Sequence, residues 1–232
     1  MTKQFPLNIS LEDGVKLESF ITGGNRQAVA ELSRSVKGDG ERFLFLWGSE
    51  GTGKSHLLQG ACREAVELGR TAAYVPLALH SRLQPELFAN LEQLDLVCLD
   101  DVQQIAGLPE WEEALFHLFN RLHERNACLL VTADCSPSAL SIQLADLGSR
   151  LCWGTVYRLI ALSDEEKQQA LLEGAARRGM RLAPETANYV LSHYSRDMGS
   201  LLAFLDRLDR ATLAEQRKPT LPFVRELLKN PD

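Results

Sequence analysis

The stretch that decides the fold of this 232-residue chain is Gly48-Ser49-Glu50-Gly51-Thr52-Gly53-Lys54-Ser55, which matches GxxxxGK[ST] at every defined position. An apolar run of strand type, residues 43–47, precedes it, and a segment with helical periodicity, residues 54–69, follows it. Glycines let such a loop bend closely around a phosphate group, so that successive N–H groups and the helix N-terminus face the anion. The stretch therefore predicts a phosphate-binding loop; a glycine-rich turn with an incidental lysine is the alternative.

Two residues of this loop, and two after a later strand, have expected roles in nucleotide chemistry. We expect the Lys54 ammonium to reach the β- and γ-phosphates and the Ser55 hydroxyl to ligate Mg²⁺. Such a site also needs a carboxylate at the end of a neighbouring strand, and residues 96–99 end in Asp100 and Asp101. We expect Asp100 on the metal side and Asp101 to polarise water. Paired acidic residues after a strand also occur as helix caps or solvated loop residues, which is the alternative for both.

Apolar runs and amphipathic segments alternate through the first two thirds of the chain. The expected strands cover residues 43–47, 72–75, 96–99, 128–131 and 156–159. Their apolar runs are continuous, as in strands that are covered on both faces. Alternation of such strands with helical segments, such as residues 54–69 and 111–125, predicts βαβ units and a mostly parallel sheet.

From Ser163 onward only helical periods remain. The expected helices cover residues 164–178, 184–194, 198–215 and 220–229. Ser163 followed by Glu166 is the signature of a capping box at a helix start. The sequence therefore predicts an α/β fold: an N-terminal arm over residues 1–12, a P-loop parallel-sheet domain over residues 13–162, and a small helical domain over residues 163–232.

Composition and charge narrow the class of protein. Acidic residues outnumber basic ones by 31 to 25, a net charge of −6, whereas domains that coat DNA phosphates are usually basic. The five cysteines include no CxxC pair, so we interpret them as reduced thiols. No apolar stretch approaches the roughly 20 residues that span a bilayer. We expect a globular cytoplasmic protein whose main ligand is not bare DNA.

Further motifs resemble the AAA+ ATPases of the replication-initiator branch, the DnaA family. The run Phe20-Ile21-Thr22-Gly23-Gly24-Asn25 resembles the segment that opens DnaA-type ATPase domains and helps line the base pocket. Leu99-Asp100-Asp101-Val102-Gln103 is similar to the DnaA Walker B motif, and Thr132-Ala133-Asp134 lies where sensor 1 belongs. Ser149-Arg150-Leu151-Cys152-Trp153-Gly154 resembles the arginine-finger box.

This resemblance implies roles for individual residues. Arg150 would be an arginine finger acting in trans, and Thr132 and Asp134 would form the sensor 1 region. A nucleotide, ADP or ATP, would be bound with Mg²⁺, and Ser55 and Asp100 would hold the metal. The expected nucleotide-binding residues are Phe20, Ile21, Gly48, Ser49, Glu50, Gly51, Thr52, Gly53, Lys54, Ser55 and His56.

Both ends of the chain resemble Hda proteins, a family of DnaA-homologous regulators. Residues 216–228 resemble their C-terminus, and the chain ends at Asp232, where DnaA initiators continue into a helix-turn-helix domain. Gln4-Phe5-Pro6-Leu7-Asn8-Ile9 is similar to the arm by which Hda proteins bind the DNA polymerase sliding clamp. In an extended peptide, Phe5, Leu7 and Ile9 can enter an apolar groove while Gln4 makes fixed hydrogen bonds. A disordered start or an edge strand would give a similar pattern.

One position departs from the family pattern. In DnaA and Hda proteins an arginine, sensor 2, opens the third lid helix and touches the nucleotide phosphates. The corresponding residue here is Gly199, and Arg196 lies nearby but out of register. The departure indicates weak or no intrinsic ATPase activity.

The resemblance thus implies a nucleotide-bound regulator of replication initiation. It would bind the sliding clamp and stimulate hydrolysis of DnaA-bound ATP through Arg150, which prevents re-initiation. DNA contact would be mainly indirect, through the clamp, with no membrane partner, and association with a second copy is left open. The alternatives are a DnaC- or IstB-like helicase loader or transposition helper that acts on single-stranded DNA, and a stand-alone ATPase.

Overall fold

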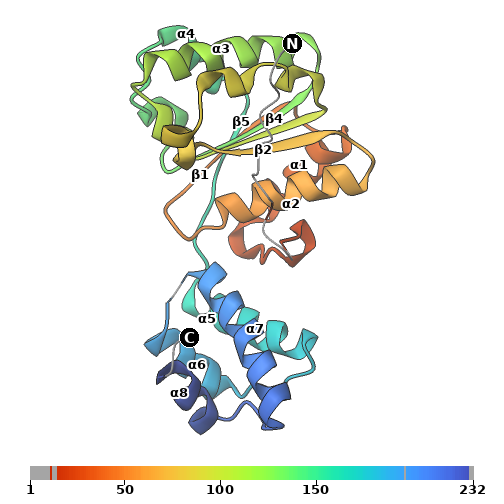
Figure 1. Cartoon of the computed structure of the whole chain (residues 1–232), viewed down its shortest axis with the longest axis vertical. Helices are drawn as coiled ribbons and strands as arrows, with labels where there is room; N and C mark the ends of the chain where they lie inside the picture. Colours follow the sequence, from red (N-terminus) through yellow and green to blue (C-terminus); the bar gives the residue numbers. More distant parts are fainter. Residues whose placement is uncertain (1–10, 12–14, 196, 230–232) are drawn as a thin grey trace. The chain divides into compact units, whose positions relative to one another are not determined.

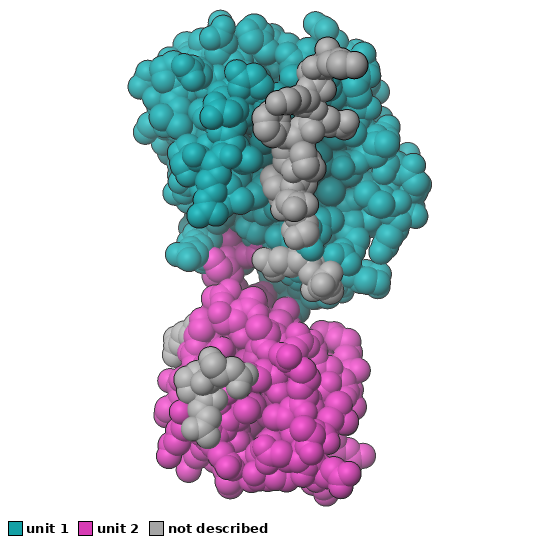
Figure 2. Space-filling model, viewed as in Figure 1, with its two compact units in different colours: residues 1–50, 54–160 teal, residues 51–53, 161–232 magenta. Residues whose placement is uncertain are grey.

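The structure is a computed structural model, and it describes residues 11, 15–195 and 197–229. The expected clamp-binding residues Gln4, Phe5, Leu7 and Ile9 lie outside the described residues, as does Arg196. The chain divides into two compact units, residues 1–50 with 54–160 and residues 51–53 with 161–232 (Figure 2). The domain boundaries expected from the sequence stay predictions.

The first unit is built on a five-stranded parallel sheet with the order β2-β3-β4-β1-β5 (Figure 1). The strands are β1 (Phe43–Trp47), β2 (Ala72–Pro76), β3 (Leu96–Asp100), β4 (Cys128–Ala133) and β5 (Thr155–Arg158). The three central strands, β1, β3 and β4, are buried on both faces, which explains their continuous apolar runs, whereas the edge strands β2 and β5 are only partly buried. The α/β prediction with a parallel sheet is therefore confirmed.

Helices cover both faces of this sheet (Figure 1). They are α1 (Arg26–Lys37) and α2 (Lys54–Glu67) on one face, and α3 (Pro109–Glu124) and α4 (Ala145–Leu151) on the other. Short 3-10 helices in the connections cover Leu17–Ser19, Gly23–Asn25, Leu77–Arg82, Pro85–Phe88, Leu91–Gln93, Val102–Ile105 and Pro137–Ala139. Because side chains alternate along a strand, Leu44 and Cys98 pack toward α1 and α2, whereas Phe45 and Leu99 pack toward α3 and α4.

The second unit contains the helical lid. Its helices are α5 (Asp164–Arg177), α6 (Pro184–His193), α7 (Met198–Glu215) and α8 (Leu221–Lys229). Leu171, Val190, Phe204 and Phe223 belong to its separate buried core. The predicted capping box is confirmed, because the Glu166 N–H donates to Ser163 Oγ at 3.2 Å and the Ser163 N–H donates to Glu166 Oε2 at 2.8 Å.

Two further findings concern thiols and membranes. The cysteines are free, and Cys62, Cys98 and Cys128 are buried in the core of the first unit. Burial raises the pKa of the Cys62 thiol to about 11 and that of the Cys128 thiol to about 12. Among the described residues, no helix has the length and apolar character needed to cross a membrane.

Gly154 marks the closest backbone approach before β5, and its replacement by alanine is expected to destabilise the first unit. A Cβ atom there would overlap the ring and the carbonyl oxygen of Phe43 on β1. Such overpacking against backbone typically costs about 1–3 kcal/mol in the free energy of unfolding. Urea unfolding of the Gly154→Ala variant measures this loss.

Gly148→Ala in α4 is the matched control. Its added Cβ would meet Ile142 Cγ2 at 3.9 Å, an ordinary contact. Alanine in place of a helical glycine gains about 0.5–1 kcal/mol. Equal unfolding midpoints for the two variants would contradict the close approach at Gly154.

Candidate nucleotide site and the arginine-bearing helix

The phosphate-loop stretch connects β1 to α2 at the carboxyl edge of the sheet. Gly51 and Gly53 have φ values of +77° and +87°, a left-handed conformation that favours glycine. Helix α2 begins at Lys54, so Ser55 and His56 lie in its first turn, where N–H groups have no partner within the helix. This is the strand–loop–helix arrangement that the sequence predicts for an anion-binding loop.

Lys54 is held against this loop. Its side chain is buried, with 8% of the residue exposed, and its Nζ donates to the carbonyl oxygens of Gly48 at 2.9 Å and Ser49 at 3.1 Å. A buried ammonium group is therefore fixed beside the glycine-rich turn. Its charge complements a phosphate bound there.

Asp100 is the last residue of β3 and is almost fully buried, with 3% exposed. Both of its carboxylate oxygens accept hydrogen bonds: Oδ1 from the Thr132 hydroxyl, and Oδ2 from the Tyr74 hydroxyl at 2.7 Å. Burial, and then the charge of Asp100, raises the pKa of Tyr74 far above its ordinary value. The Tyr74 hydroxyl therefore stays protonated and remains a donor.

Asp101 adopts a left-handed backbone conformation with φ of +61°. Its N–H donates to Thr132 Oγ1 at 2.9 Å, which joins the predicted sensor 1 residue to both acidic residues. The Gln103 amide donates to Asp101 Oδ1 at 3.0 Å, and Gln103 Oε1 accepts from the Asp134 N–H at 3.3 Å. The expected Walker B and sensor 1 residues thus form one hydrogen-bonded group.

The groups around Asp101 shift the pKa of its carboxyl in opposite directions. Burial raises the pKa of its carboxyl, and the nearby charges of Asp100 and Asp134 raise it further. The hydrogen bond from Gln103 and the positive charge of Lys54 lower it. The net effect is a raised pKa, with burial as the largest cause.

The residues present suit Mg²⁺. Asp100 offers a fixed carboxylate and Ser55 a hydroxyl, and Mg²⁺ prefers a few such oxygen ligands together with phosphate oxygens and water. Among the described residues, no three His, Cys, Asp or Glu side chains gather into a metal cluster.

The segment expected to line the base pocket lies beside the first turn of α2. His56 Nε2 is 3.2 Å from Ser19 Oγ, and the His56 and Phe20 rings are 5.8 Å apart. Asn25 is buried and pairs with the backbone of Ile160 through two hydrogen bonds, of 2.9 and 2.8 Å. Phe20 and Ile21 are half-buried.

Arg150 lies in the last turn of α4, remote in sequence from the phosphate loop. Its guanidinium carbon lies 3.9 Å from the centroid of the Trp153 ring, a cation–π arrangement. The Trp153 side chain is 59% exposed, and Phe119 and His123 contact the ring edge-on. Within the part of the chain that the structure describes, Arg150 has no ion pair.

A buried glutamate that the sequence did not indicate holds the start of α4. Glu112, which is 1% exposed, accepts hydrogen bonds from the N–H groups of Gly107, Gln143 and Leu144. It thereby fixes the entry of the helix that carries Arg150. Tyr74 is another contributing residue that the sequence did not assign to the site, and Gln103, quoted only as part of the Walker B-like run, had no expected role of its own.

The position expected for sensor 2 carries no side chain. Gly199 lies in the first turn of α7, where its N–H donates to Asp197 Oδ1 at 2.9 Å. The Ser200 N–H donates to Asp197 Oδ2 at 2.8 Å, so Asp197 caps the helix. A carboxylate, not an arginine, therefore occupies this helix N-terminus.

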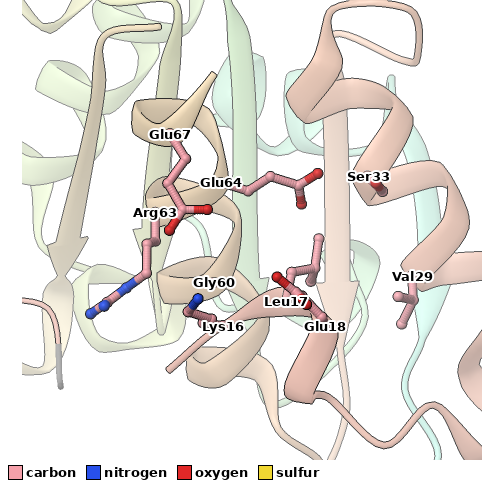
Figure 3. Close-up of a pocket in the computed structure, with 9 residues that line it drawn as sticks. All are labelled: Lys16, Leu17, Glu18, Val29, Ser33, Gly60, Arg63, Glu64 and Glu67. Atoms are coloured by element: carbon pink, nitrogen blue, oxygen red, sulfur yellow. The ribbon is translucent and has the colours of Figure 1, made fainter. Parts of the chain in front are cut away.

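A separate pocket of about 420 Å³ lies on the first unit, between residues 16–18, α1 and the second half of α2 (Figure 3). Its lining mixes both signs of charge, with Arg63 and Lys16 near Glu64 and Glu67. The phosphate loop precedes the first turn of α2, so this pocket is not the phosphate site.

Family models match almost the whole chain. The model described as the bacterial DnaA ATPase domain matches residues 11–158, and the model described as the Hda lid domain matches residues 164–228. A Haemophilus influenzae protein, described as uncharacterized, is 44% identical over 229 residues, which are 98% of this chain and 99% of that protein.

Solved structures of DnaA proteins also match this chain. Domain III of the Thermotoga maritima replication initiation protein DnaA matches with a TM-score of 0.75 over 95% of this chain and 98% of that chain; at 24% identity, the match concerns the fold alone. AMPPCP-bound DnaA from Aquifex aeolicus matches with a TM-score of 0.70 and 26% identity, over 89% of this chain and 71% of that chain. The chain therefore belongs to the DnaA family of AAA+ proteins, as a DnaA-type ATPase domain followed by an Hda lid domain.

Proposed function

We propose that this chain is a nucleotide-bound regulator that provides Arg150 to the active site of a DnaA–ATP partner and so stimulates hydrolysis there. Its family, with a DnaA-type ATPase domain and an Hda lid domain, is one of replication-initiation regulators. The observation that carries the proposal is the stacking of the half-exposed Arg150 on the exposed Trp153 ring, with a guanidinium group that has no ion-pair partner among the described residues.

The site supports nucleotide binding. The related Aquifex aeolicus DnaA structure contains the nucleotide analogue AMPPCP. In this chain the glycine turn, the buried Lys54 ammonium and the first turn of α2 would hold the phosphates, and Asp100 and Ser55 would hold Mg²⁺. Mg²⁺, when bound, would neutralise phosphate charge. Family resemblance favours ADP as the resident nucleotide.

Arg150 would act outside its own chain. In phosphoryl transfer, negative charge spreads over the equatorial oxygens of the transferred group, and an arginine provided in trans stabilises it. The planar guanidinium group matches two phosphate oxygens at once. Stacking on Trp153 limits the orientations of the guanidinium before the partner arrives, which reduces the entropy lost on docking.

Two features support little hydrolysis by the chain itself. Gly199 offers no side chain to the phosphates, and the Asp101 carboxylate, which would have to polarise water, is engaged by the Gln103 amide. The proposed activity is therefore stimulation of a partner rather than turnover of bound nucleotide.

The decisive experiment reconstitutes the reaction from purified components. DnaA loaded with radiolabelled ATP is mixed with this chain, ADP, and sliding clamp loaded on DNA, and conversion of bound ATP to ADP is followed. The proposal requires faster conversion that depends on both this chain and the clamp. Conversion at the rate of DnaA alone contradicts it, and retention of replicative helicase instead of clamp in a pull-down would favour the helicase-loader alternative.

The N-terminal arm is proposed to bind the clamp, on the resemblance of residues 4–9 to the Hda arm. Replacing Gln4, Leu7 and Ile9 together by alanine is expected to abolish clamp binding, because the polar anchor and two of the three apolar side chains that would enter the groove are lost. Surface plasmon resonance on immobilised clamp measures it. Replacing Lys3, Asn8 and Ser10 instead gives a control that should bind normally, and clamp binding that persists in the first variant refutes the arm assignment.

A further inference from the structure

We propose that Tyr74 is a positioning residue for the Asp100 carboxylate, and that its hydroxyl sets how strongly Mg²⁺ tightens nucleotide binding. The inference rests on the proposed nucleotide site and adds to it a residue on β2, outside the phosphate loop, Walker B and sensor 1 segments. Tyr74 would act through Asp100 and would touch neither phosphate nor metal.

The topology of the sheet places donors on both sides of Asp100. Strand β3 lies between β2 and β4, and Pro76 on β2 is the register partner of Asp100. Side chains two residues apart share a face, so Tyr74 lies on the same face as Pro76 and reaches Asp100 along β2. Thr132 on β4 donates to the other carboxylate oxygen, so the carboxylate is held between two strands.

Two donors fix an orientation that one donor would leave free. Rotation about the bond to a carboxylate group has a broad, roughly two-fold energy profile, so the side chain alone does not set it. The Tyr74 hydroxyl at 2.7 Å from Oδ2, together with Thr132 at Oδ1, defines the plane in which the remaining lone pairs point. Mg²⁺ demands near-ideal octahedral geometry and tolerates a misplaced ligand poorly.

Apolar packing accounts for an aromatic ring at position 74, but it does not account for the hydroxyl group on that ring. The ring packs against the apolar core that also contains Leu57 and Cys98. Phenylalanine would fill the same space, since the two rings are alike in shape. The hydroxyl bonds to Asp100 and also to the Gln59 side chain. Tyr74→Phe removes both hydrogen bonds and keeps the ring, so the contribution that acts through Asp100 is separated by repeating the substitution in an Asp100→Asn chain.

The expected effect of Tyr74→Phe is a weaker response to Mg²⁺. Loss of a hydrogen bond that orients a metal ligand typically lowers metal affinity by about 10- to 100-fold. We expect the Mg²⁺ concentration that half-saturates the ADP complex to rise by about tenfold. ADP affinity in excess EDTA should stay unchanged, because the Lys54 and backbone contacts with phosphate remain.

The experiment uses the full chain, isothermal titration calorimetry and ADP, with and without Mg²⁺. Tyr157→Phe is the matched control, because Tyr157 lies on β5 at the opposite edge of the sheet and packs against the same core. It should leave the Mg²⁺ dependence at the wild-type value. Thermal unfolding of both variants without nucleotide compares their folded states.

A double-mutant cycle with Asp100→Asn tests whether Tyr74 acts through Asp100. The proposal predicts that Tyr74→Phe causes no further shift in Mg²⁺ dependence in the Asp100→Asn chain. An equal shift in both backgrounds, an unchanged Mg²⁺ midpoint, or an ADP affinity that falls equally in EDTA would each overturn it. If the proposed nucleotide site itself is wrong, the result differs: the wild-type chain then binds ADP neither with Mg²⁺ nor in EDTA.

Discussion

Replacing Arg150 by alanine is expected to lower the stimulated hydrolysis of DnaA-bound ATP by at least about 10³-fold, because an arginine provided in trans is worth 10³–10⁵ in rate. Arg150 lies at the end of α4, half-exposed, and its guanidinium contacts the exposed Trp153 ring. No ion pair ties it to its own fold among the described residues, so its removal should leave folding intact. The single-turnover rate of labelled ATP conversion with purified DnaA, clamp and DNA measures the loss.

Two further variants test whether the effect needs the planar guanidinium group rather than a positive charge alone, and whether it is specific to position 150. Arg150→Lys keeps the positive charge but loses the planar fork that matches phosphate, and should recover little of the rate. Arg158→Ala removes another arginine stacked over a tryptophan, Trp47, and should stimulate normally. ADP and clamp affinities should be wild-type in all three variants. Undiminished stimulation by Arg150→Ala would eliminate the arginine-finger role.

The sheet could be predicted from the sequence because its central strands, β1, β3 and β4, are buried on both faces and are therefore continuous apolar runs. Residues 43–47 coincide with β1, and only the ends of the other strands differ. Helix α1 was not predicted, although Ala28, Leu32 and Val36 recur at helical spacing and Gly38 ends the helix with φ of +91°. Helix α4 was also not predicted, because its seven residues span only two turns and give no periodic signal.

The phosphate loop could be predicted because all of its residues lie in one short run of the sequence. The residues that hold Asp100 and the start of α4 in place are far apart in the sequence and could not be predicted in this way. The Tyr74–Asp100 hydrogen bond joins residues 26 positions apart, and Glu112 accepts a hydrogen bond from the backbone 32 positions away at Leu144. Such pairs depend on strand order and on the connection between α3 and α4. A tyrosine in a strand or a glutamate in a helix has, in sequence alone, no distinguishing pattern.

Replacing Lys54 by alanine is expected to weaken ADP binding by about 30-fold or more. Removing one partner of a buried, hydrogen-bonded charge pair costs about 2–5 kcal/mol, and each 1.4 kcal/mol is tenfold in affinity. The Lys54 ammonium is already buried beside the glycine turn, held by the carbonyl groups of Gly48 and Ser49, so the variant loses a positive charge that is fixed in place before ADP binds. Calorimetric titration with ADP and Mg²⁺ measures the change.

Thermal unfolding gives an independent measure of the same loss. A ligand at 100 times its dissociation constant stabilises the folded state by about 2.7 kcal/mol, so ADP should raise the unfolding temperature of wild-type chain but not of Lys54→Ala. Lys37→Ala is the control, since its ammonium is exposed and pairs with Glu64 at 3.8 Å on the surface. An ADP-induced shift of equal size in Lys54→Ala and Lys37→Ala would mean that the loop holds no phosphate, and the nucleotide site would have to lie elsewhere.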